Sequence, residues 1–252
     1  MDLSGHAFPG RNDLWLVDGV VVRRHDDATR ATVEWIHRFL AQLAFNGSKP
    51  VPHFDGESVT VIDGAVWSAV SFVKGEIVGW SLTPSMFELG AYLARFHEAA
   101  AVVEMDAQQS PVFPVDAPGH ADRRRQVIHG DPTNHNVVAA GSPPLPCGII
   151  DFGNAYIDVP LFDIGCALWR SGRPAQAVHE FTPDRISAYV EGYSSVRPLS
   201  DDDRVAVVAY LRARGRQIVT KQAARGVADD GPHRKLDWLD RHEHDLVSVL
   251  IP

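Results

Sequence analysis

Short runs of β-branched residues dominate the beginning of the chain. Residues 14–25 read LWLVDGVVVRRH, in which two apolar runs flank Asp18-Gly19. Because Asp-Gly favours a two-residue hairpin turn, this segment predicts a β-hairpin. Residues 58–73 hold two further apolar runs around Asp63-Gly64 and predict a second pair of strands.

One amphipathic helix is predicted between these two strand pairs. Within residues 26–47, acidic side chains come first, apolar residues recur at helical spacing from Val33 to Leu43, and Asn46-Gly47 closes the segment. The first part of the chain is therefore expected to be mostly β-structure with a single helix.

The apolar period changes to that of a helix after residue 82. Thr83-Pro84 predicts an N-cap followed by proline at the first helical position. Ser200 and Asp203 have the spacing of a capping box. Further helices are predicted at residues 160–171, 182–194 and 200–225, a loop at 104–122, and one hairpin formed by NVVAA and CGIID around the turn GSPPLP.

These elements predict an α+β chain with two lobes. Residues 1–75 form the small antiparallel β lobe with one helix, and residues 76–252 form a larger, mainly helical lobe that carries the central hairpin. Ligands favour the cleft between two such lobes, so the candidate site is expected there.

Composition excludes some function classes. The 252 residues are 45% hydrophobic, and 24 basic against 32 acidic residues give a net charge of -8, which disfavours nucleic-acid binding and tilts toward a cationic small ligand. We expect no membrane span and no secretion signal, because no apolar run reaches about 18–20 residues and the first residues lack a basic start before an apolar stretch. Two cysteines without metal or disulfide spacing fit a reducing, cytoplasmic location.

Polar residues interrupt a strand-like run in VIHGDPTNHNVV, residues 127–138. The two strands of a hairpin bring their outer ends together, which would place Asp131, Asn136 and Asp151 around one small volume. The quoted strands contain no lysine or arginine to neutralise the carboxylates. Such hard oxygen ligands suit Mg²⁺, whose coordination is usually completed by substrate phosphates, so a phosphate donor is predicted. A metal site in RHEHD, residues 241–245, is less favoured than a solvated helical face.

The segments HGDPTNHN and IIDFGNAYIDVPLFDIG resemble the signature of the aminoglycoside phosphotransferase and choline kinase family, which is related to the protein kinases. The resemblance implies a bilobal, protein-kinase-like fold. It further implies that the small lobe, with a hinge near residue 75, binds the nucleotide, and that the helical lobe carries the catalytic loop, the metal site and the acceptor pocket.

The resemblance also implies roles for the motif residues. Asp131 would orient the acceptor hydroxyl and accept its proton, and Asn136 and Asp151 would hold Mg²⁺. His129 would support the loop architecture. For Asp163 two roles are open, bracing of the catalytic loop, which we favour, or stabilisation of a helix start.

Asp158 is expected to be a loop cap, and its place near the cleft keeps it a candidate for substrate contact. A cationic acceptor could also use other acidic residues of the helical lobe, which surface solvation explains equally well. These residues are Glu180, Glu191, Asp201, Asp202 and Asp203.

In the small lobe, the resemblance implies a basic strand residue that contacts phosphates and pairs with a helical glutamate. Arg23 and Glu34 are the predicted pair, with a solvent-facing pair as the alternative. Asn12 follows the glycine-containing turn that would cover the phosphates, and residues 1–15 are expected to order as a flap when nucleotide binds. Ser71 and Val73 are the predicted hinge contacts to the base.

The predicted function is ATP-dependent phosphorylation of a small-molecule hydroxyl, with GTP as the alternative donor. An aminoglycoside or another hydroxylated antibiotic is the first acceptor, which implies antibiotic resistance. A metabolic kinase acting on a homoserine-like or choline-like acceptor is the rival, because GYSSVRPLSDDDR resembles the homoserine-kinase-like branch. A protein kinase and a non-catalytic nucleotide-binding protein are less favoured, the former because DFG lies only a few residues before Pro160. The partner is a small acceptor, and the protein is expected to be a monomer or a homodimer.

Overall fold

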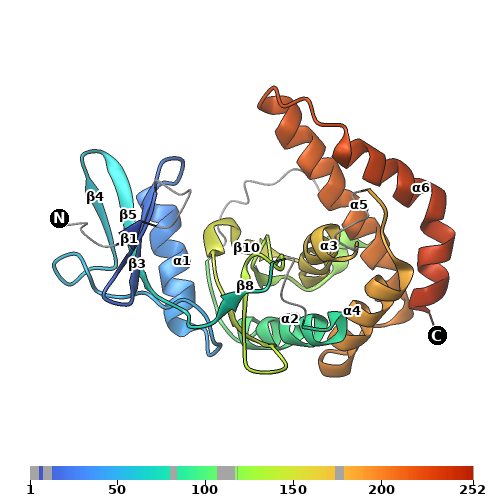
Figure 1. Ribbon diagram of the computed structural model, residues 1–252, viewed down its shortest axis with the longest axis horizontal. Helices are drawn as coiled ribbons and strands as arrows, with labels where there is room; N and C mark the ends of the chain where they lie inside the picture. The colour runs from blue at the N-terminus through green and yellow to red at the C-terminus, as the bar shows by residue number, and fades with distance from the viewer. Residues whose placement is uncertain are drawn as a thin grey trace.

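The computed structural model describes residues 6–7, 13–79, 84–106, 117, 119–173 and 179–251. The roles predicted for Asn12 and Thr83 and most of the predicted nucleotide flap lie outside these ranges. The described chain is a mixed α+β structure with antiparallel sheets and a helical C-terminal part, as the sequence predicted. A β-rich lobe lies at one end and a helical lobe at the other (Figure 1).

The small lobe is built on one antiparallel sheet with the strand order β1-β2-β3-β5-β4. Its strands are β1 (His6–Ala7), β2 (Leu14–Val17), β3 (Val20–His25), β4 (Val59–Ile62) and β5 (Ala65–Ser71). Both predicted hairpins form. Positive φ angles of 49° at Asp18 and 78° at Gly19 allow the tight turn that connects β2 to β3.

Among the residues of the small lobe that the structure describes, one helix is present, α1 (Arg30–Gln42). The side chain of Thr29 accepts a hydrogen bond from the backbone N–H of Thr32 and caps the helix. The acidic residues expected at its start lie before this cap, and the helix ends at Gln42, before Asn46-Gly47. The predicted helix is therefore present, but the predicted segment was too long at both ends.

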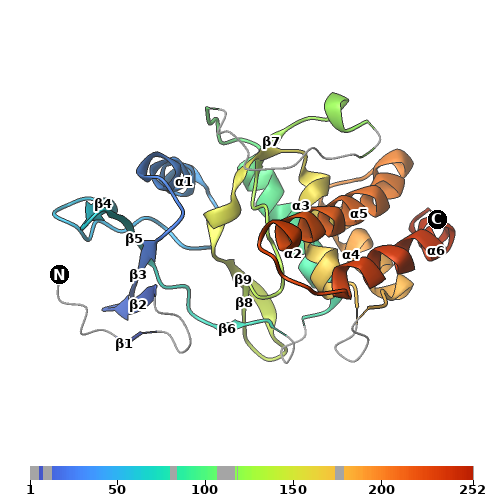
Figure 2. The same ribbon diagram turned by 90° about the horizontal axis from the view of Figure 1, so that it is seen from above.

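The helical lobe follows a short connecting strand, β6 (Glu76–Ile77). Figures 1 and 2 show its helices gathered at the end of the molecule away from the five-stranded sheet. Its helices are α2 (Met86–Ala100), α3 (Pro160–Ser171), α4 (Pro183–Val196), α5 (Asp201–Ala224) and α6 (Gly231–Leu250). Its remaining elements are the 3-10 turns η1 (His120–Asp122) and η2 (Phe152–Asn154) and the strands β7 (Gln126–Ile128), β8 (Val137–Ala140), β9 (Leu145–Ile149) and β10 (Tyr156–Asp158).

The start of α2 corrects one prediction. Ser85, not Thr83, is the N-cap, and Ser85 and Glu88 form a reciprocal capping box. The helix therefore begins two residues after Pro84. The capping box predicted for Ser200 and Asp203 is present at the start of α5.

Two glycines allow α2 and α4 to approach each other closely. A Cβ atom added to Gly90 would lie 2.0 Å from the carbonyl oxygen of Tyr189, and one added to Gly192 would lie 1.9 Å from that of Phe87. These helices and α3 enclose the main core, which extends to Phe39 on α1. The loop that carries the predicted catalytic residue is thus supported by packed helices. Among the helices that the structure describes, none is both long and apolar enough to cross a membrane.

Candidate active site

A cavity of about 510 Å³ lies between the sheet of the small lobe and the central hairpin of the helical lobe. Arg23, Ser71 and Val73 line it from the small-lobe side. Asn136 and Asp151 line it from the hairpin side. Five of the residues predicted from the sequence therefore border one cavity, and Asp131 is hydrogen-bonded through its backbone carbonyl to one of them, Asn136.

The loop between β7 and β8 is held by a buried carboxylate. Asp163, on α3, accepts hydrogen bonds from the backbone N–H of His129 at 2.7 Å and from that of Gly130 at 2.8 Å. Gly130 has a φ of 77°, and a Cβ there would lie 2.1 Å from the carbonyl oxygen of Asn154. Only glycine fits this close approach, which explains the glycine in HGD. The contacts of Asp163 are those expected of a bracing residue.

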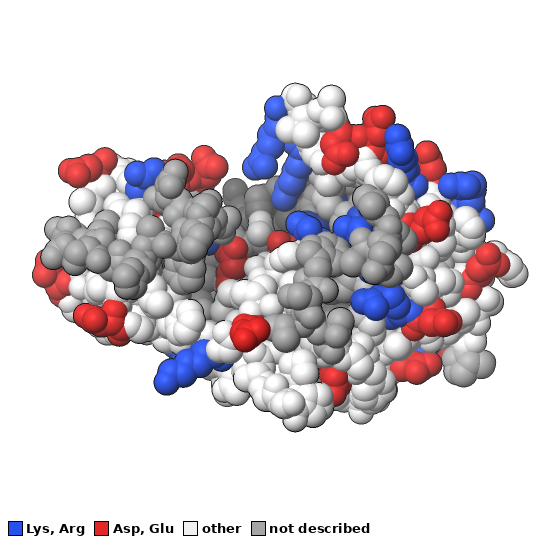
Figure 3. Space-filling view, viewed as in Figure 1, with Lys and Arg blue, Asp and Glu red and all other residues white. Residues whose placement is uncertain are grey.

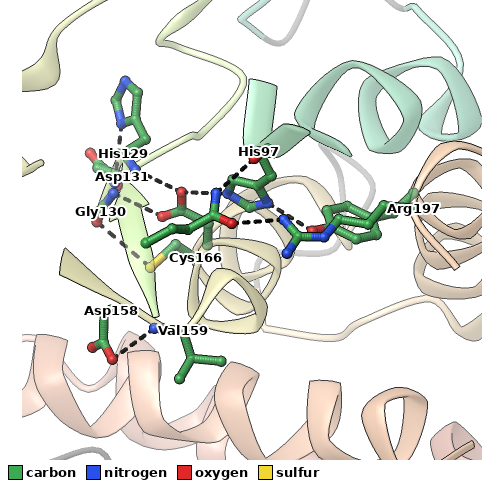
Figure 4. Close-up of polar contacts among 11 residues, drawn as sticks. His97, His129, Gly130, Asp131, Asp158, Val159, Cys166 and Arg197 are labelled. Atoms are coloured by element: carbon green, nitrogen blue, oxygen red, sulfur yellow. Dashed lines mark hydrogen bonds and ion pairs between the residues drawn. The ribbon is translucent and has the colours of Figure 1, made fainter. Parts of the chain in front are cut away.

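Asp163 is itself part of a buried network with His97, His129 and Gly130, three residues that Figure 4 labels. His97 Nε2 lies 3.1 Å from Asp163 Oδ2, and His97 Nδ1 lies 2.8 Å from the hydroxyl of Tyr193. Since an ionised carboxylate only accepts, Nε2 donates to Asp163 and Nδ1 accepts from Tyr193. Burial lowers the pKa of His97, against the opposing effect of Asp163. Sequence reasoning missed His97 and Tyr193, because they lie on α2 and α4, far from the motif.

His129 connects the catalytic loop to the second strand of the hairpin. Its Nδ1 accepts from the backbone N–H of Asp131 at 3.3 Å, so Nε2 carries the proton and donates to the carbonyl oxygen of Ile150 at 2.9 Å. The ring is fully buried. These bonds hold Asp131 at a set position relative to the residue that precedes Asp151.

Asn136 makes the second connection between the same segments. Its side-chain Nδ2 donates to the backbone carbonyl oxygen of Asp131 at 2.9 Å, and its backbone carbonyl oxygen accepts from the backbone N–H of Ile150 at 2.9 Å. With Nδ2 turned toward the loop, the amide oxygen remains as an acceptor. Asp131, Asn136 and Asp151 are thus joined through the backbone, as the hairpin argument expected.

Asp151 has a left-handed backbone, with a φ of 61°. The next residue, Phe152, is buried against three rings, with centroid distances of 4.6 Å to His129, 6.1 Å to Phe39 and 5.9 Å to Phe96. This packing offsets the strain of the turn and directs the carboxylate of Asp151 toward the cavity.

Two arginines from distant elements contact the predicted carboxylates. Arg23 Nη1, on β3, lies 2.7 Å from Asp151 Oδ1, and Arg214 Nη2, on α5, lies 2.8 Å from Asp131 Oδ1. The hairpin strands contain no basic residue, but the tertiary structure supplies one cation to each carboxylate. Sequence reasoning missed Arg214, because an arginine on an amphipathic helix looks like a surface residue.

The predicted pair of Arg23 and Glu34 is wrong. Glu34 accepts a hydrogen bond from Arg30 at 2.6 Å, one helical turn away on the exposed side of α1. The polar side chain of α1 that lines the cavity is instead His37, which is bonded to Ser58 at 2.8 Å. Burial lowers the pKa of His37 to about 4. A histidine within the apolar stripe of the helix was the signal that could have found it.

Asp158 lies on β10 and not in a loop, which corrects its assignment as a loop cap. Its side chain is buried, with Oδ1 at 3.3 Å from His120 Nε2 and 3.5 Å from Arg125 Nη1. Oδ1 also accepts from the backbone N–H of Val159. The carboxylate is therefore already neutralised within the protein.

The donor set fits a magnesium ion that is shared with phosphates. Asn136 offers one amide oxygen, and Asp151 offers the carboxylate oxygen that Arg23 does not contact. Mg²⁺ is commonly held by one or two protein oxygens together with substrate phosphates. The described residues hold no cluster of three or more His, Cys, Asp or Glu side chains that could bind a metal ion.

Comparison with known proteins agrees with this geometry. Residues 104–199 match the sequence model of the phosphotransferase enzyme family, APH. The solved structure of a microcompartment-associated aminopropanol kinase superposes with a TM-score of 0.74 at 18% identity, over 98% of this chain and 94% of that one. The chain has a protein-kinase-like fold, and its residues 104–199 resemble the phosphotransferase enzyme family. Both the predicted resemblance and the predicted fold are confirmed.

Other similar proteins extend the comparison. A GDP complex of an aminoglycoside 2'-phosphotransferase-IIIa superposes with a TM-score of 0.64 at 16% identity, over 97% of this chain and 94% of that one. Homoserine kinases from Phenylobacterium zucineum and Methylobacillus glycogenes are 29% and 24% identical over 68% and 70% of this chain. The chain spans only 61% and 63% of the length of these two relatives.

Proposed function

We propose that this protein transfers the γ-phosphate of ATP to a hydroxyl group of a small molecule. The observation that carries the proposal is the linked position of Asp131, Asn136 and Asp151 beside a cavity between the lobes. The comparisons agree with a small-molecule kinase.

Asp131 is the proposed catalytic residue. Its carboxylate would orient the acceptor hydroxyl and accept the proton late in the transfer, as in other phosphoryl-transfer enzymes. The hydrogen bonds of His129 and Asn136 fix the backbone at Asp131, so the loop is already set before substrates bind. Alignment is expected to supply most of the acceleration.

The metal ligands are proposed to be Asn136 and Asp151. A bound Mg²⁺ neutralises charge on the phosphates and orients them. Arg23 lines the same cavity and contacts Asp151, which supports its proposed role as a phosphate-binding residue. Its guanidinium offers more donors than the single bond to Asp151 uses.

The nucleotide is proposed to bind in the 510 Å³ cavity, whose volume suits a ligand of that size. The backbone near Ser71 and Val73 would contact the base, and the division of the lobes near residue 75 is part of this proposal. ATP is the proposed donor, with GTP as the alternative. Among the structural relatives, an amicoumacin kinase was solved in complex with AMP-PNP and an aminoglycoside phosphotransferase in complex with GDP.

Two acceptor classes follow from the relatives. An aminoglycoside or related antibiotic is supported by structural relatives named aminoglycoside phosphotransferase and amicoumacin kinase, and would make the protein a resistance enzyme. An amino alcohol such as homoserine is supported by curated relatives named homoserine kinase. A cytoplasmic location and a monomeric or homodimeric state belong to the same proposal.

The proposal is tested with ADP release and nucleotide binding. We expect metal-dependent ADP release in the presence of an acceptor, lost by at least a hundredfold in Asp131→Asn with nucleotide affinity retained. Asp245→Asn removes the same charge from an exposed position on α6 and is the matched control. Full activity of Asp131→Asn, or a wild-type protein that does not bind Mg-ATP, would contradict the proposal.

A further inference from the structure

The carboxylate of Asp131 is paired with a cation from α5. Arg214 Nη2 contacts Asp131 Oδ1 at 2.8 Å, and Arg214 Nη1 donates to Gln217 Oε1 at 2.6 Å, one turn further along α5. The side chain of Arg214 is only 14% exposed. Its Nε is buried and has no acceptor among the described residues. The guanidinium is therefore fixed beside the proposed base and holds donor capacity that these residues do not use.

A second basic residue lies on the same helix. Lys221 lies seven residues after Arg214, two turns along the same face of α5. Burial lowers the pKa of Lys221, and the positive charge of Arg214 lowers it further. Arg214 and Lys221 therefore lie on one face of α5, and Arg214 contacts Asp131, in spite of the acidic balance of the whole chain.

Basic side chains also gather on the surface of the helical lobe. Blue side chains gather on the helical lobe beside the crevice and on the projecting end formed by α5 and the start of α6 (Figure 3). Two of the acidic residues that sequence analysis named for a cationic acceptor are engaged elsewhere. Asp158 pairs with His120 and Arg125, and Asp203 pairs with Arg123.

We propose that the acceptor carries an anionic group, a carboxylate or a phosphate, close to the hydroxyl that is phosphorylated, and that Arg214 recognises it. This inference rests on the proposed kinase activity and names the substrate class of the same site. A guanidinium that shares its donors between Asp131 and an anion aligns the acceptor hydroxyl with the base. A polycationic acceptor would meet Arg214 and Lys221 at a place where Asp131 is already paired, so like charges would oppose its binding.

The test compares acceptors that differ only in the anionic group. L-Homoserine and 3-aminopropan-1-ol differ by one carboxylate. Glycerate, glycerol 3-phosphate and glycerol separate a carboxylate from a phosphate and from no charge, and kanamycin represents the polycations. We expect kcat/KM for the preferred anionic member to exceed that for its uncharged or decarboxylated counterpart by at least tenfold, mainly through KM.

The variant Arg214→Gln identifies the residue responsible. It removes the cation with little change in length, and we expect it to abolish the preference for the anionic acceptor while Mg-ATP affinity remains. Loss of the contact to Asp131 lowers turnover of every acceptor alike. The decisive quantity is therefore the ratio of kcat/KM for an anionic acceptor to kcat/KM for its uncharged or decarboxylated counterpart. Arg216→Gln makes the same charge change on the exposed side of α5 and is expected to keep the ratio.

Failure of this inference differs from failure of the proposed function. Phosphorylation of kanamycin, glycerol or 3-aminopropan-1-ol in preference to the anionic compounds overturns the inference and leaves the kinase proposal intact. The inference is also overturned when Mg-ATP binds and no anionic member is phosphorylated, or when Arg214→Gln keeps the wild-type ratio. Absence of Mg-ATP binding contradicts the proposed function itself.

Discussion

Replacement of Asp163 by asparagine perturbs the support of the catalytic loop with little change in side-chain shape. The wild-type carboxylate is fully buried and accepts from the backbone N–H groups of His129 and Gly130 and from His97 Nε2. An amide has one accepting oxygen. Whichever way the asparagine side chain turns, its NH₂ group faces at least one of these donors.

The expected loss of stability follows from these contacts. A buried backbone N–H left without an acceptor costs roughly 1–3 kcal/mol, and the remaining bonds lose their charge assistance, worth about 1 kcal/mol more. We therefore expect Asp163→Asn to lower the free energy of unfolding by about 2–4 kcal/mol, which for a domain of this size lowers Tm by roughly 5–15 °C. Displacement of Gly130 also moves Asp131, so turnover falls even where the protein remains folded.

Urea unfolding at neutral pH measures the stability, and acceptor-dependent ADP release measures turnover of the folded fraction. Asp245→Asn is the control for loss of one negative charge on the surface. A change in unfolding free energy below about 0.5 kcal/mol, the range of ordinary surface substitutions, would refute the reasoning that Asp163 holds the loop.

Three further predictions concern the small lobe and the helix packing. Burial lowers the pKa of His37 to about 4 in the folded protein, so the unfolded chain takes up a proton first as pH falls below about 6.5. The contribution of His37 to the free energy of unfolding is constant above that pH and falls between about pH 6.5 and 4, by roughly 1–2 kcal/mol at pH 5. Urea unfolding at pH 7 and at pH 5 should therefore show a smaller loss of stability for His37→Gln than for wild type. An equal loss in the two proteins would disprove this. Gly192→Ala places a Cβ 1.9 Å from the carbonyl oxygen of Phe87, and thermal unfolding should show a loss of about 2–3 kcal/mol, with an unchanged Tm as the contrary result. Glu34→Gln removes an exposed pair with Arg30, so stability should change by less than about 0.5 kcal/mol; calorimetry should find Mg-ATP affinity unchanged, and a tenfold loss would restore Glu34 to the nucleotide site.

Local pattern was sufficient for much of the fold. The hairpin at Asp18-Gly19 and the helix α3 follow from turn chemistry and from apolar period, which act over a few residues. Errors occurred at element ends, as at Ser85, where one capping side chain competes with another nearby. The spacing of Asp131, Asn136 and Asp151 also predicts the candidate site, because a hairpin places residues that are distant along the chain close together in space.

The partners of these residues depended on the tertiary structure. Arg214 is 83 residues from Asp131, and His97 is 66 residues from Asp163. Nothing in the local pattern distinguishes a helical arginine facing solvent from one facing the catalytic loop, because that choice is made by how α3 and α5 pack. The sequence by itself determined the elements and the carboxylates of the proposed site, and helix packing decided which charges surround them.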